Sequence, residues 1–269
     1  MEGKQVLFEL LSNTKLYLPF SHWAITWPVE LTGELVTIGL LSCFVALSGY
    51  ELRSLRDSYP TWRIHRSYLT NMSLFAFNSI FVIVFSVSML LAIAERNAGY
   101  GLLSLTLNPA FKVILSFLAV DLLLYGWHRA CHRFNFLWLF HRVHHSDRYL
   151  NVSTAFRVHF LEIFTTTCLK VGLIILLGID KMSVLAIEAL ILVSMMFHHT
   201  NARFKFERIL GSFITVPTLQ RVHHSAEPKG LNYTTVSCYP SGTGYLGRSQ
   251  LQSQAELDSR KGRLKKCST

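Results

Sequence analysis

Five long stretches of this chain are nearly free of charged side chains. The clearest runs from Ser67 to Ala94, with no charged residue between Arg66 and Glu95. Because a helix needs about 20 apolar residues to cross the hydrocarbon core of a bilayer, such stretches predict membrane-spanning helices. The other four are Leu31–Tyr50, Phe111–Trp127, Ile163–Ile179 and Ser183–Phe197. We therefore expect an all-α fold, a multi-pass membrane helical bundle, in which the last two stretches form a hairpin rather than a shallower re-entrant pair.

The composition agrees with a lipid environment. Only 16% of the 269 residues are charged and 51% are hydrophobic, whereas a soluble domain carries about 25% charged residues. The net charge of +10 indicates cytoplasm-facing loops before nucleic-acid binding, because no basic segment alternates with aromatic residues. The five cysteines are scattered and contain no CxxC pair, so they predict neither a disulfide framework nor a thiolate metal site.

Arginine placement predicts the orientation of the bundle, since cytoplasmic loops of membrane proteins carry an excess of arginine and lysine. Arginines accumulate in the segments 53–66, 129–157 and 203–221. The loop between the second and third stretches has only Arg96, with Lys112 at its far edge. One topology satisfies this pattern: the N-terminus lies outside, and every arginine-rich segment and histidine cluster lies on the cytoplasmic side.

Ten of the twelve histidines lie between His128 and His224. Several are spaced by three or four residues, which places them on one face of a helix. Imidazole is a ligand for zinc, iron, copper and nickel, and eight to ten imidazoles suffice for two metal ions. The sequence therefore predicts a metal site at the cytoplasmic end of the bundle. The clusters are His128 and His132; His141, His144 and His145; His198 and His199; and His223 and His224.

Other histidines and three acidic residues have separate interpretations. His22 and His65 are expected to be interfacial side chains, and His159 is equally a ligand or a residue behind the ligands. Metal-bound imidazole usually donates its second N–H to a carboxylate or carbonyl. Asp121 lies two helical turns before His128 inside an apolar stretch, so we expect it to be such an acceptor. Glu162 is expected to do the same for His159, and Glu188 has no assigned partner.

Other classes of protein remain open on the residues alone. A metal transporter would distribute its ligands along the spans as a pathway, whereas these cluster at one end. A membrane cytochrome with a bis-histidine haem would not need adjacent histidine pairs.

These clusters, in this order, resemble the fatty acid hydroxylase/sterol desaturase superfamily. The resemblance rests on DLLLYGWHR from Asp121, LWLFHRVHHS from Leu137, RVH from Arg157, HTN from His199, and the stretch from Thr215 to Ser225. It implies a membrane core with a cytoplasmic di-iron site of two iron ions. Such enzymes use dioxygen and electrons from a cytochrome b5 or ferredoxin system to hydroxylate or desaturate a lipid, such as a sterol or fatty acyl chain. The implied ligands are His128, His132, His141, His144, His145, His199, His223 and His224, with His159 and His198 as further candidates.

Two features depart from the family pattern. The last histidine box of the family is HxxHH, and its first position here is Gln220, which offers a neutral amide in place of an imidazole. After Asn232 and Tyr233 the family continues with a segment similar to LSxWDRLFGT, which this chain lacks. A catalytically impaired or inactive relative is therefore the alternative to an active oxygenase.

The departure at the tail suggests a change of reading frame. The segment from Cys238 to Arg248 can be encoded so that the frame starting at the third base reads Leu-Ser-Val-Trp-Asp-Arg-Val-Phe-Gly-Thr. We hypothesise that residues from about Ser237 onward are an out-of-frame, disordered terminus.

The predicted organisation has three parts. Residues 1–112 form an N-terminal membrane region with two transmembrane helices, residues 113–236 the catalytic domain, and residues 237–269 the tail. We expect the endoplasmic reticulum membrane in a eukaryote or the inner membrane in a bacterium.

Overall fold

The computed structural model describes residues 27–55, 61–105, 108–224, 235–236 and 239–240. The chain divides into two units, residues 1–38 and 39–269. In the first unit the described residues are the opening turns of one helix. The second unit holds the other helices and every candidate metal ligand that the structure describes. His22 and most of the predicted tail lie outside the described residues.

The predicted all-α fold is confirmed. Among the described residues, the strands are two short ones that pair antiparallel, Thr235 with Pro240 and Val236 with Tyr239. The elements are α2 (Trp27–Leu55), α3 (Thr61–Ile80), the π-helix η2 (Phe81–Val87), α4 (Ser88–Asn97), the 3₁₀ helix η3 (Leu102–Leu105), α5 (Pro109–Arg133), α6 (Asn135–His145), the 3₁₀ helix η4 (Val152–Phe156), α7 (Phe160–Leu177), α8 (Lys181–His199), α9 (Glu207–Leu210), α10 (Pro217–His223), β1 (Thr235–Val236) and β2 (Tyr239–Pro240).

In the part of the chain that the structure describes, four helices are long and apolar enough to cross a membrane, and they match four of the five predicted stretches. They are Gly33–Ser54, Pro109–Arg133, Phe160–Leu177 and Lys181–His199. The fifth stretch, Ser67–Ala94, is bent. The helical segments Thr61–Ile80 and Phe85–Asn97 meet at 49°, with η2 at the break, and π-helical turns commonly interrupt the regular hydrogen bonding of a helix.

A short turn connects α7 to α8, as the predicted hairpin requires. Gly178 adopts a left-handed conformation with φ of 70°, and its N–H and that of Ile179 both donate to the Ile174 carbonyl, which ends α7. Asp180 then caps α8 by accepting from the Ser183 N–H at 2.9 Å. Although burial opposes it, hydrogen bonds to Ser183 hold the pKa of Asp180 below its usual value.

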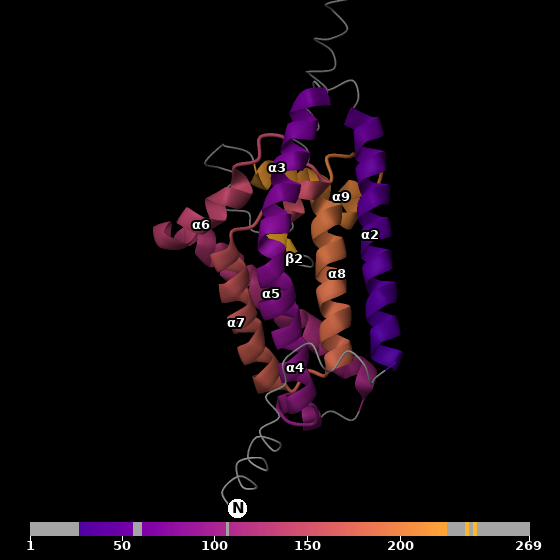
Figure 1. Cartoon of the computed structure of the whole chain (residues 1–269), viewed down its shortest axis with the longest axis vertical. Helices are drawn as coiled ribbons and strands as arrows, with labels where there is room; N and C mark the ends of the chain where they lie inside the picture. Colours follow the sequence, from indigo (N-terminus) through magenta and orange to yellow (C-terminus); the bar gives the residue numbers. More distant parts are fainter. Residues whose placement is uncertain (1–26, 56–60, 106–107, 225–234, 237–238, 241–269) are drawn as a thin grey trace, which may run out of the picture. The chain divides into compact units, whose positions relative to one another are not determined.

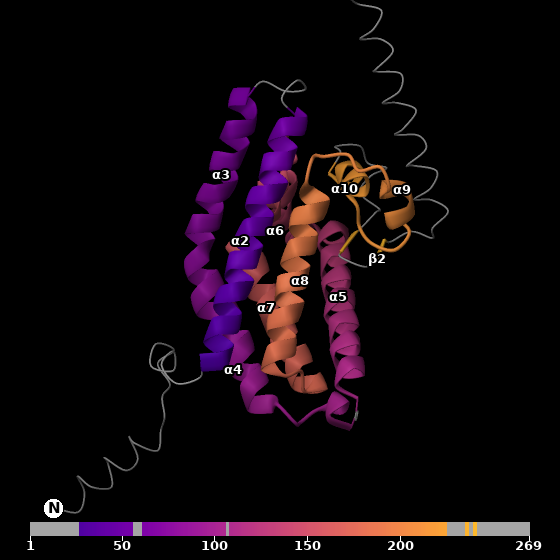
Figure 2. The same cartoon turned by 90° about the vertical axis from the view of Figure 1, so that its right-hand side faces the viewer.

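Apolar side chains from four helices form one hydrophobic core of the second unit. Leu90 and Ala94 of α4 pack with Val120 of α5, Ile174 of α7 and Ile187 of α8. The helix α4 contacts both α7 and α8, and α5 also contacts both. Figures 1 and 2 show α5, α7 and α8 running side by side. The helices α6, α9 and α10 lie toward the end of the bundle where α5 and α8 finish, so this end collects the histidine-bearing segments.

The opposite end of the bundle depends on the close packing of Gly178. A Cβ atom on Gly178 would lie 1.5 Å from the Tyr100 carbonyl oxygen, and the left-handed conformation of Gly178 is strained for other residues. We expect Gly178→Ala to lower the thermal unfolding midpoint, with a destabilisation of about 1–3 kcal/mol. In the same helical hairpin, Gly172 has no atom within 4 Å of its would-be Cβ, so Gly172→Ala is the matched control. Fluorescence-detected thermal unfolding in detergent measures both, and equal midpoints would contradict the packing at Gly178.

The orientation of the bundle remains a prediction that labelling can test. Ser146 and Ser212 are exposed near the histidine-bearing end, and Tyr100 is exposed near the other. Single-cysteine reporters at 146 and 212 are expected to react with a membrane-impermeant reagent only from the cytoplasmic side, and one at 100 only from outside. Labelling of 146 and 212 from opposite faces would contradict this topology.

Candidate metal centre

Local structure brings the histidine-bearing segments together. The helix α5 ends at Arg133, and the extended backbone of Phe134 (φ −107°, ψ 120°) lets α6 start in a new direction at the next residue. His128 and His132 lie in the last turns of α5, and His141, His144 and His145 lie in α6. The other candidate ligands come from the end of α8, from α10 and from the residue that follows α10. Pro217 occupies the first turn of α10, as its fixed φ favours.

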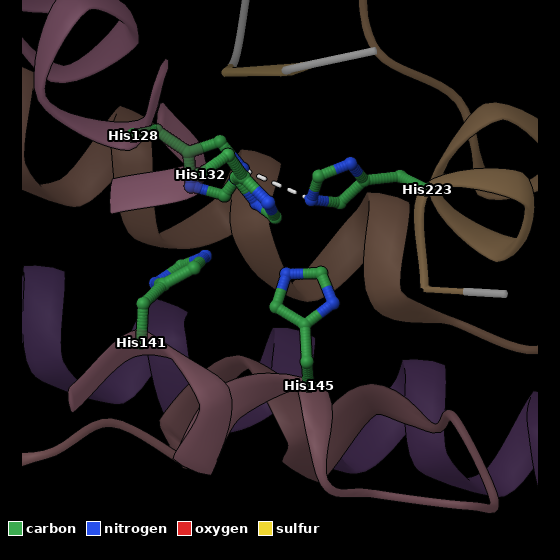
Figure 3. A group of neighbouring side chains, drawn as sticks. All are labelled: His128, His132, His141, His145 and His223. Atoms are coloured by element: carbon green, nitrogen blue, oxygen red, sulfur yellow. Dashed lines mark hydrogen bonds between the residues drawn. The ribbon is translucent and has the colours of Figure 1, made fainter. Parts of the chain in front are cut away.

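Five histidines form the first group. Their potential ligand nitrogens all lie within 4.8 Å of one another, and His128 Nε2 is 3.0 Å from His223 Nε2. Figure 3 shows the rings converging from α5, α6 and α10. We call this set the five-histidine group: His128, His132, His141, His145 and His223.

Three further histidines, His144, His199 and His224, form the second group, also within 4.8 Å of one another. We call it the three-histidine group. His144 Nε2 lies 3.1 Å from His199 Nε2. Gln220 is 2% exposed, and its amide nitrogen lies 3.2 Å from His199 Nε2. The eight histidines implied by the resemblance therefore all fall in these two groups, five and three.

Backbone carbonyls fix the tautomers of two members of the three-histidine group, His144 and His199. His144 Nδ1 donates to the Arg157 carbonyl at 3.3 Å, and His199 Nδ1 donates to the Met195 carbonyl at 2.7 Å. With the proton on Nδ1, each Nε2 presents a lone pair. Two lone pairs that face each other at 3.1 Å repel unless a cation lies between them. A metal ion could bind both nitrogens at the ordinary metal–imidazole distance of about 2 Å.

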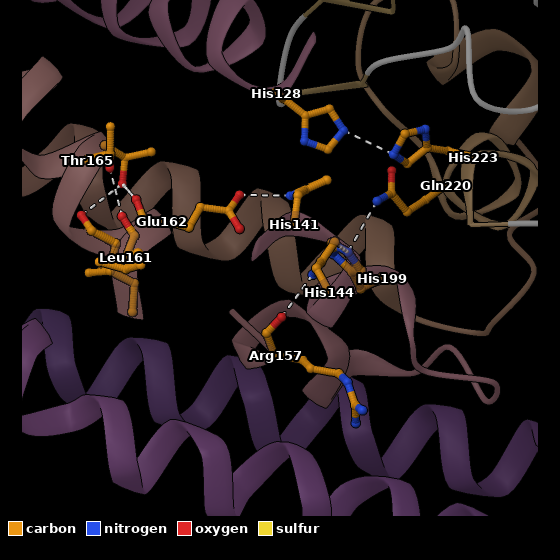
Figure 4. A network of polar contacts seen from close by, with 12 residues as sticks. His128, His141, His144, Arg157, Leu161, Glu162, Thr165, His199, Gln220 and His223 are labelled. Atoms are coloured by element: carbon orange, nitrogen blue, oxygen red, sulfur yellow. Dashed lines mark hydrogen bonds and ion pairs between the residues drawn. The ribbon is translucent and has the colours of Figure 1, made fainter. Parts of the chain in front are cut away.

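A carboxylate orients one ring of the five-histidine group. His141 Nδ1 donates to Glu162 Oε1 at 2.8 Å, as Figure 4 shows, which leaves His141 Nε2 facing the other rings. Carboxylates and carbonyls behind metal-bound histidines commonly hold the ring and its tautomer in this way. The partner of Glu162 is thus His141, whereas the sequence suggested His159, and the orienting role of Glu162 stays a prediction.

The inner nitrogens of several rings have no hydrogen-bond partner among the described residues. These buried atoms are His132 Nε2, His141 Nε2, His145 Nε2 and both ring nitrogens of His224. Buried polar atoms are nearly always satisfied, since an unsatisfied one costs about 1–3 kcal/mol. Metal coordination would satisfy this set, so the residues present fit a metal ion.

Burial also keeps the rings outside the spanning helices neutral. Desolvation, with a smaller contribution from His141, lowers the pKa of His144 to about 4. Desolvation likewise lowers the pKa of His145 and His224 below the usual range. A neutral imidazole carries the lone pair that a metal ion needs, so these rings are ready to bind metal at neutral pH.

Polar contacts behind the three-histidine group hold it in position. The Arg157 side chain donates to the Val143 carbonyl at 2.9 Å and to Asn71 Oδ1 at 2.9 Å. Asp147 accepts from the Asn71 amide at 2.8 Å and from the Ser67 hydroxyl. Through these contacts α3 fixes the loop whose carbonyl orients His144.

Glu51 is a second supporting residue that sequence reasoning missed. It is fully buried and accepts from the Val152 N–H at 2.9 Å, the Asn201 N–H at 3.3 Å and the Tyr68 hydroxyl at 3.2 Å. It thereby ties the end of α2 to the segments that follow α6 and α8. A carboxylate near the end of an apolar stretch was the available signal.

The remaining predicted residues lie outside the two groups. His159 caps α7 by accepting from the Leu161 N–H at 3.2 Å, and His198 is buried with its ring 4.7 Å from that of His199. Asp121 is buried in α5, and its orienting role stays a prediction. His65 is exposed. Glu188, which had no assigned partner, pairs with Lys170 at 2.8 Å.

Gln220 is expected to weaken metal binding by the three-histidine group. Its amide nitrogen offers His199 a hydrogen-bond donor, whereas a fourth ligand at this position would offer the metal a lone pair. We expect Gln220→His to increase the metal retained per chain after dialysis against a chelator, as measured by mass spectrometry of the elements. Gln220→Leu, which removes the amide without adding a ligand, is the control and should bring no gain. If Gln220→His retains no more metal than the wild type, Gln220 does not occupy a ligand position.

Comparisons with known proteins agree with this geometry. Residues 113–239 match the fatty acid hydroxylase family, a range that contains both histidine groups. Alkylglycerol monooxygenase of Danio rerio is 32% identical over 130 residues, which cover 48% of this chain and 28% of that protein. The protein of the same name from Homo sapiens is 37% identical over 68 residues, or 25% of this chain and 15% of that protein. The chain therefore spans less than a third of the length of these relatives.

No solved structure matches the chain significantly. The histidine-bearing region of the chain matches the fatty acid hydroxylase family, which supports the resemblance to the fatty acid hydroxylase/sterol desaturase superfamily.

Proposed function

We propose that the chain is a membrane-bound, non-haem di-iron oxidoreductase that uses dioxygen and external electrons to hydroxylate or desaturate a lipid. The observation that carries the proposal is the pair of facing lone pairs on His144 and His199, 3.1 Å apart. The five-histidine group beside it provides ligands for a second ion. Iron bound there would activate dioxygen, and imidazole is a ligand for iron as well as for zinc, copper and nickel.

The chain's own residues would orient the ligands and limit water at the site. Glu162 holds His141, and the carbonyls of Arg157 and Met195 hold His144 and His199. The side chains of His141, His144 and His199 are almost completely buried. This arrangement fixes ring positions before metal binds, which reduces the reorganisation that binding requires.

The relatives named alkylglycerol monooxygenases suggest the substrate class. We propose an alkylglycerol, whose apolar chain can remain in the bilayer while its glycerol end approaches the histidines. A sterol or fatty acyl lipid is the alternative. The electrons would come from a cytochrome b5 or ferredoxin system, and the protein would work in the endoplasmic reticulum membrane of a eukaryote or the inner membrane of a bacterium.

Gln220 favours a second candidate function, that of a catalytically impaired member of the family. Its amide nitrogen, 3.2 Å from His199 Nε2, gives the three-histidine group a donor in place of a fourth lone pair. Such a protein would bind metal mainly in the five-histidine group. A metal transporter is less well supported, because the segments that carry the two groups lie at one end of the bundle rather than along a path through it (Figure 2).

Metal content and lipid products together test the proposal. Protein purified in detergent without chelators is expected to hold about two iron ions per chain, since eight imidazoles can serve two ions. His144→Ala removes one of the facing lone pairs and should lose much of this metal. His65→Ala alters an exposed histidine outside both groups and should keep all of it.

Lipids of a host that expresses each variant should then be compared by mass spectrometry. Oxidised alkylglycerol products should appear with the wild type and His65→Ala and be absent with His144→Ala. Wild-type protein that holds metal yet yields no oxidised lipid would favour the impaired candidate. Wild-type protein without stoichiometric metal would contradict both.

A further inference from the structure

The segment from Arg203 to Phe213 follows directly on a membrane-spanning helix. The candidate span of α8 ends at His199, so only three residues separate the two. Figure 2 shows α9, which lies within this segment, close to the end of α8. Three residues reach about 10 Å at most, so the segment must begin within the interfacial layer of any membrane that α8 crosses.

Aromatic contacts fix the depth of this segment independently. The ring of Phe204 stacks on that of Tyr50, with centroids 5.6 Å apart and planes at 19°, and it also contacts Phe197 of α8 at 5.4 Å. Tyr50 lies one turn before Ser54, the end of the α2 span. The segment is therefore held against the ends of two spanning helices.

The single carboxylate of the segment is turned toward the protein. Glu207 is 6% exposed. Its Oε1 accepts from the Phe204 N–H at 2.8 Å, and its Oε2 accepts from the N–H and the hydroxyl of Thr218. Arg221 lies 3.8 Å away on the same side. No negative charge from this segment is thus left on its outer face.

The outer face is apolar and basic. Phe206, Ile209 and Phe213 are 66%, 64% and 70% exposed, and Arg203 and Lys205 are exposed beside them. Large apolar side chains grouped on a surface usually mark an interaction site. Apolar side chains flanked by cations are typical of segments that lie in the headgroup layer of a membrane.

We propose that the segment 203–213 lies in the headgroup layer of the membrane that the protein spans. Phe206, Ile209 and Phe213 enter the boundary between headgroups and acyl chains, and Arg203 and Lys205 contact the phosphate groups of anionic phospholipids. The proposal rests on α8 and α2 as spanning helices and is independent of the proposed oxygenase activity.

The helix α6, which carries histidines of both groups, presents the same pattern of exposed apolar and basic side chains. It follows the candidate span of α5 after one residue, and Phe134, Phe136 and Leu139 are exposed. Arg133 and Arg142 are exposed with them, and the sequence from 133 to 146 contains no acidic residue. Two segments that carry or adjoin metal ligands therefore have faces suited to the same lipid layer, which places the metal centre at headgroup depth.

Fluorescence in lipid nanodiscs tests the proposal on the full chain. An environment-sensitive fluorescent amino acid is introduced at 206 or 213 by codon suppression, with position 148 as control, because Arg148 is exposed near the same end without exposed apolar neighbours in sequence. Emission at 206 and 213 is expected to be shifted to shorter wavelength than at 148. Lipids that carry a nitroxide near the headgroup should quench the emission at 206 and 213 several-fold more strongly than the emission at 148. The combined variant Arg203→Glu and Lys205→Glu should weaken the quenching in anionic nanodiscs.

Two results would overturn the proposal. Emission at 206 and 213 equal to that at 148, without quenching by the lipid nitroxide, would mean that the face is in water. A short-wavelength emission that the nitroxide does not quench would mean that protein covers the face. Deletion of residues 241–269 and a measurement of the oligomeric state would then identify the cover as the tail or a second copy. Unchanged metal content and elution volume confirm that each labelled protein is folded.

Discussion

The metal centre depends on one electrostatic constraint, the repulsion between imidazole lone pairs that face each other. His144 and His199 cannot turn away, because the carbonyls of Arg157 and Met195 accept the protons on their outer nitrogens. Their inner nitrogens stay 3.1 Å apart, and a shared cation would make that separation favourable. Burial prevents the proton from serving as this cation, since the pKa of His144 is lowered to about 4.

Buried polar contacts elsewhere in the fold maintain this geometry. Asn71 and Asp147 hold Arg157, and Glu51 joins the end of α2 to the segments after α6 and α8. A charged or amide group in an apolar bundle is costly unless it is fully hydrogen-bonded, and each of these accepts or donates several bonds. Removing one of them would release a histidine-bearing segment as well as unpair a buried group, so these residues matter for the site although they are not ligands.

The two histidine groups differ in a way that affects how metal would be bound. Five imidazoles surround one position, whereas the other has three imidazoles and the amide of Gln220. The exposed faces of α6 and of the segment 203–213 suggest that both positions lie near the lipid headgroups. A lipid could then bring its polar end to the histidines while its chain stays in the bilayer, which is the arrangement that an oxygenase acting on an alkylglycerol would need.

The sequence by itself determined the all-α fold, four candidate membrane-spanning helices and the eight histidines of the two groups. These features depend on local periodicity, on the length of apolar runs and on motifs that lie close together in the chain. Only the tertiary structure decided which histidines share a group, that Glu162 serves His141 rather than His159, and that His159 caps a helix. It also decided the bend within Ser67–Ala94 and the roles of Glu51 and Asn71. These depend on contacts between residues that are often 80 or more positions apart, and no local pattern in the sequence specifies which distant backbone group a buried polar side chain will meet.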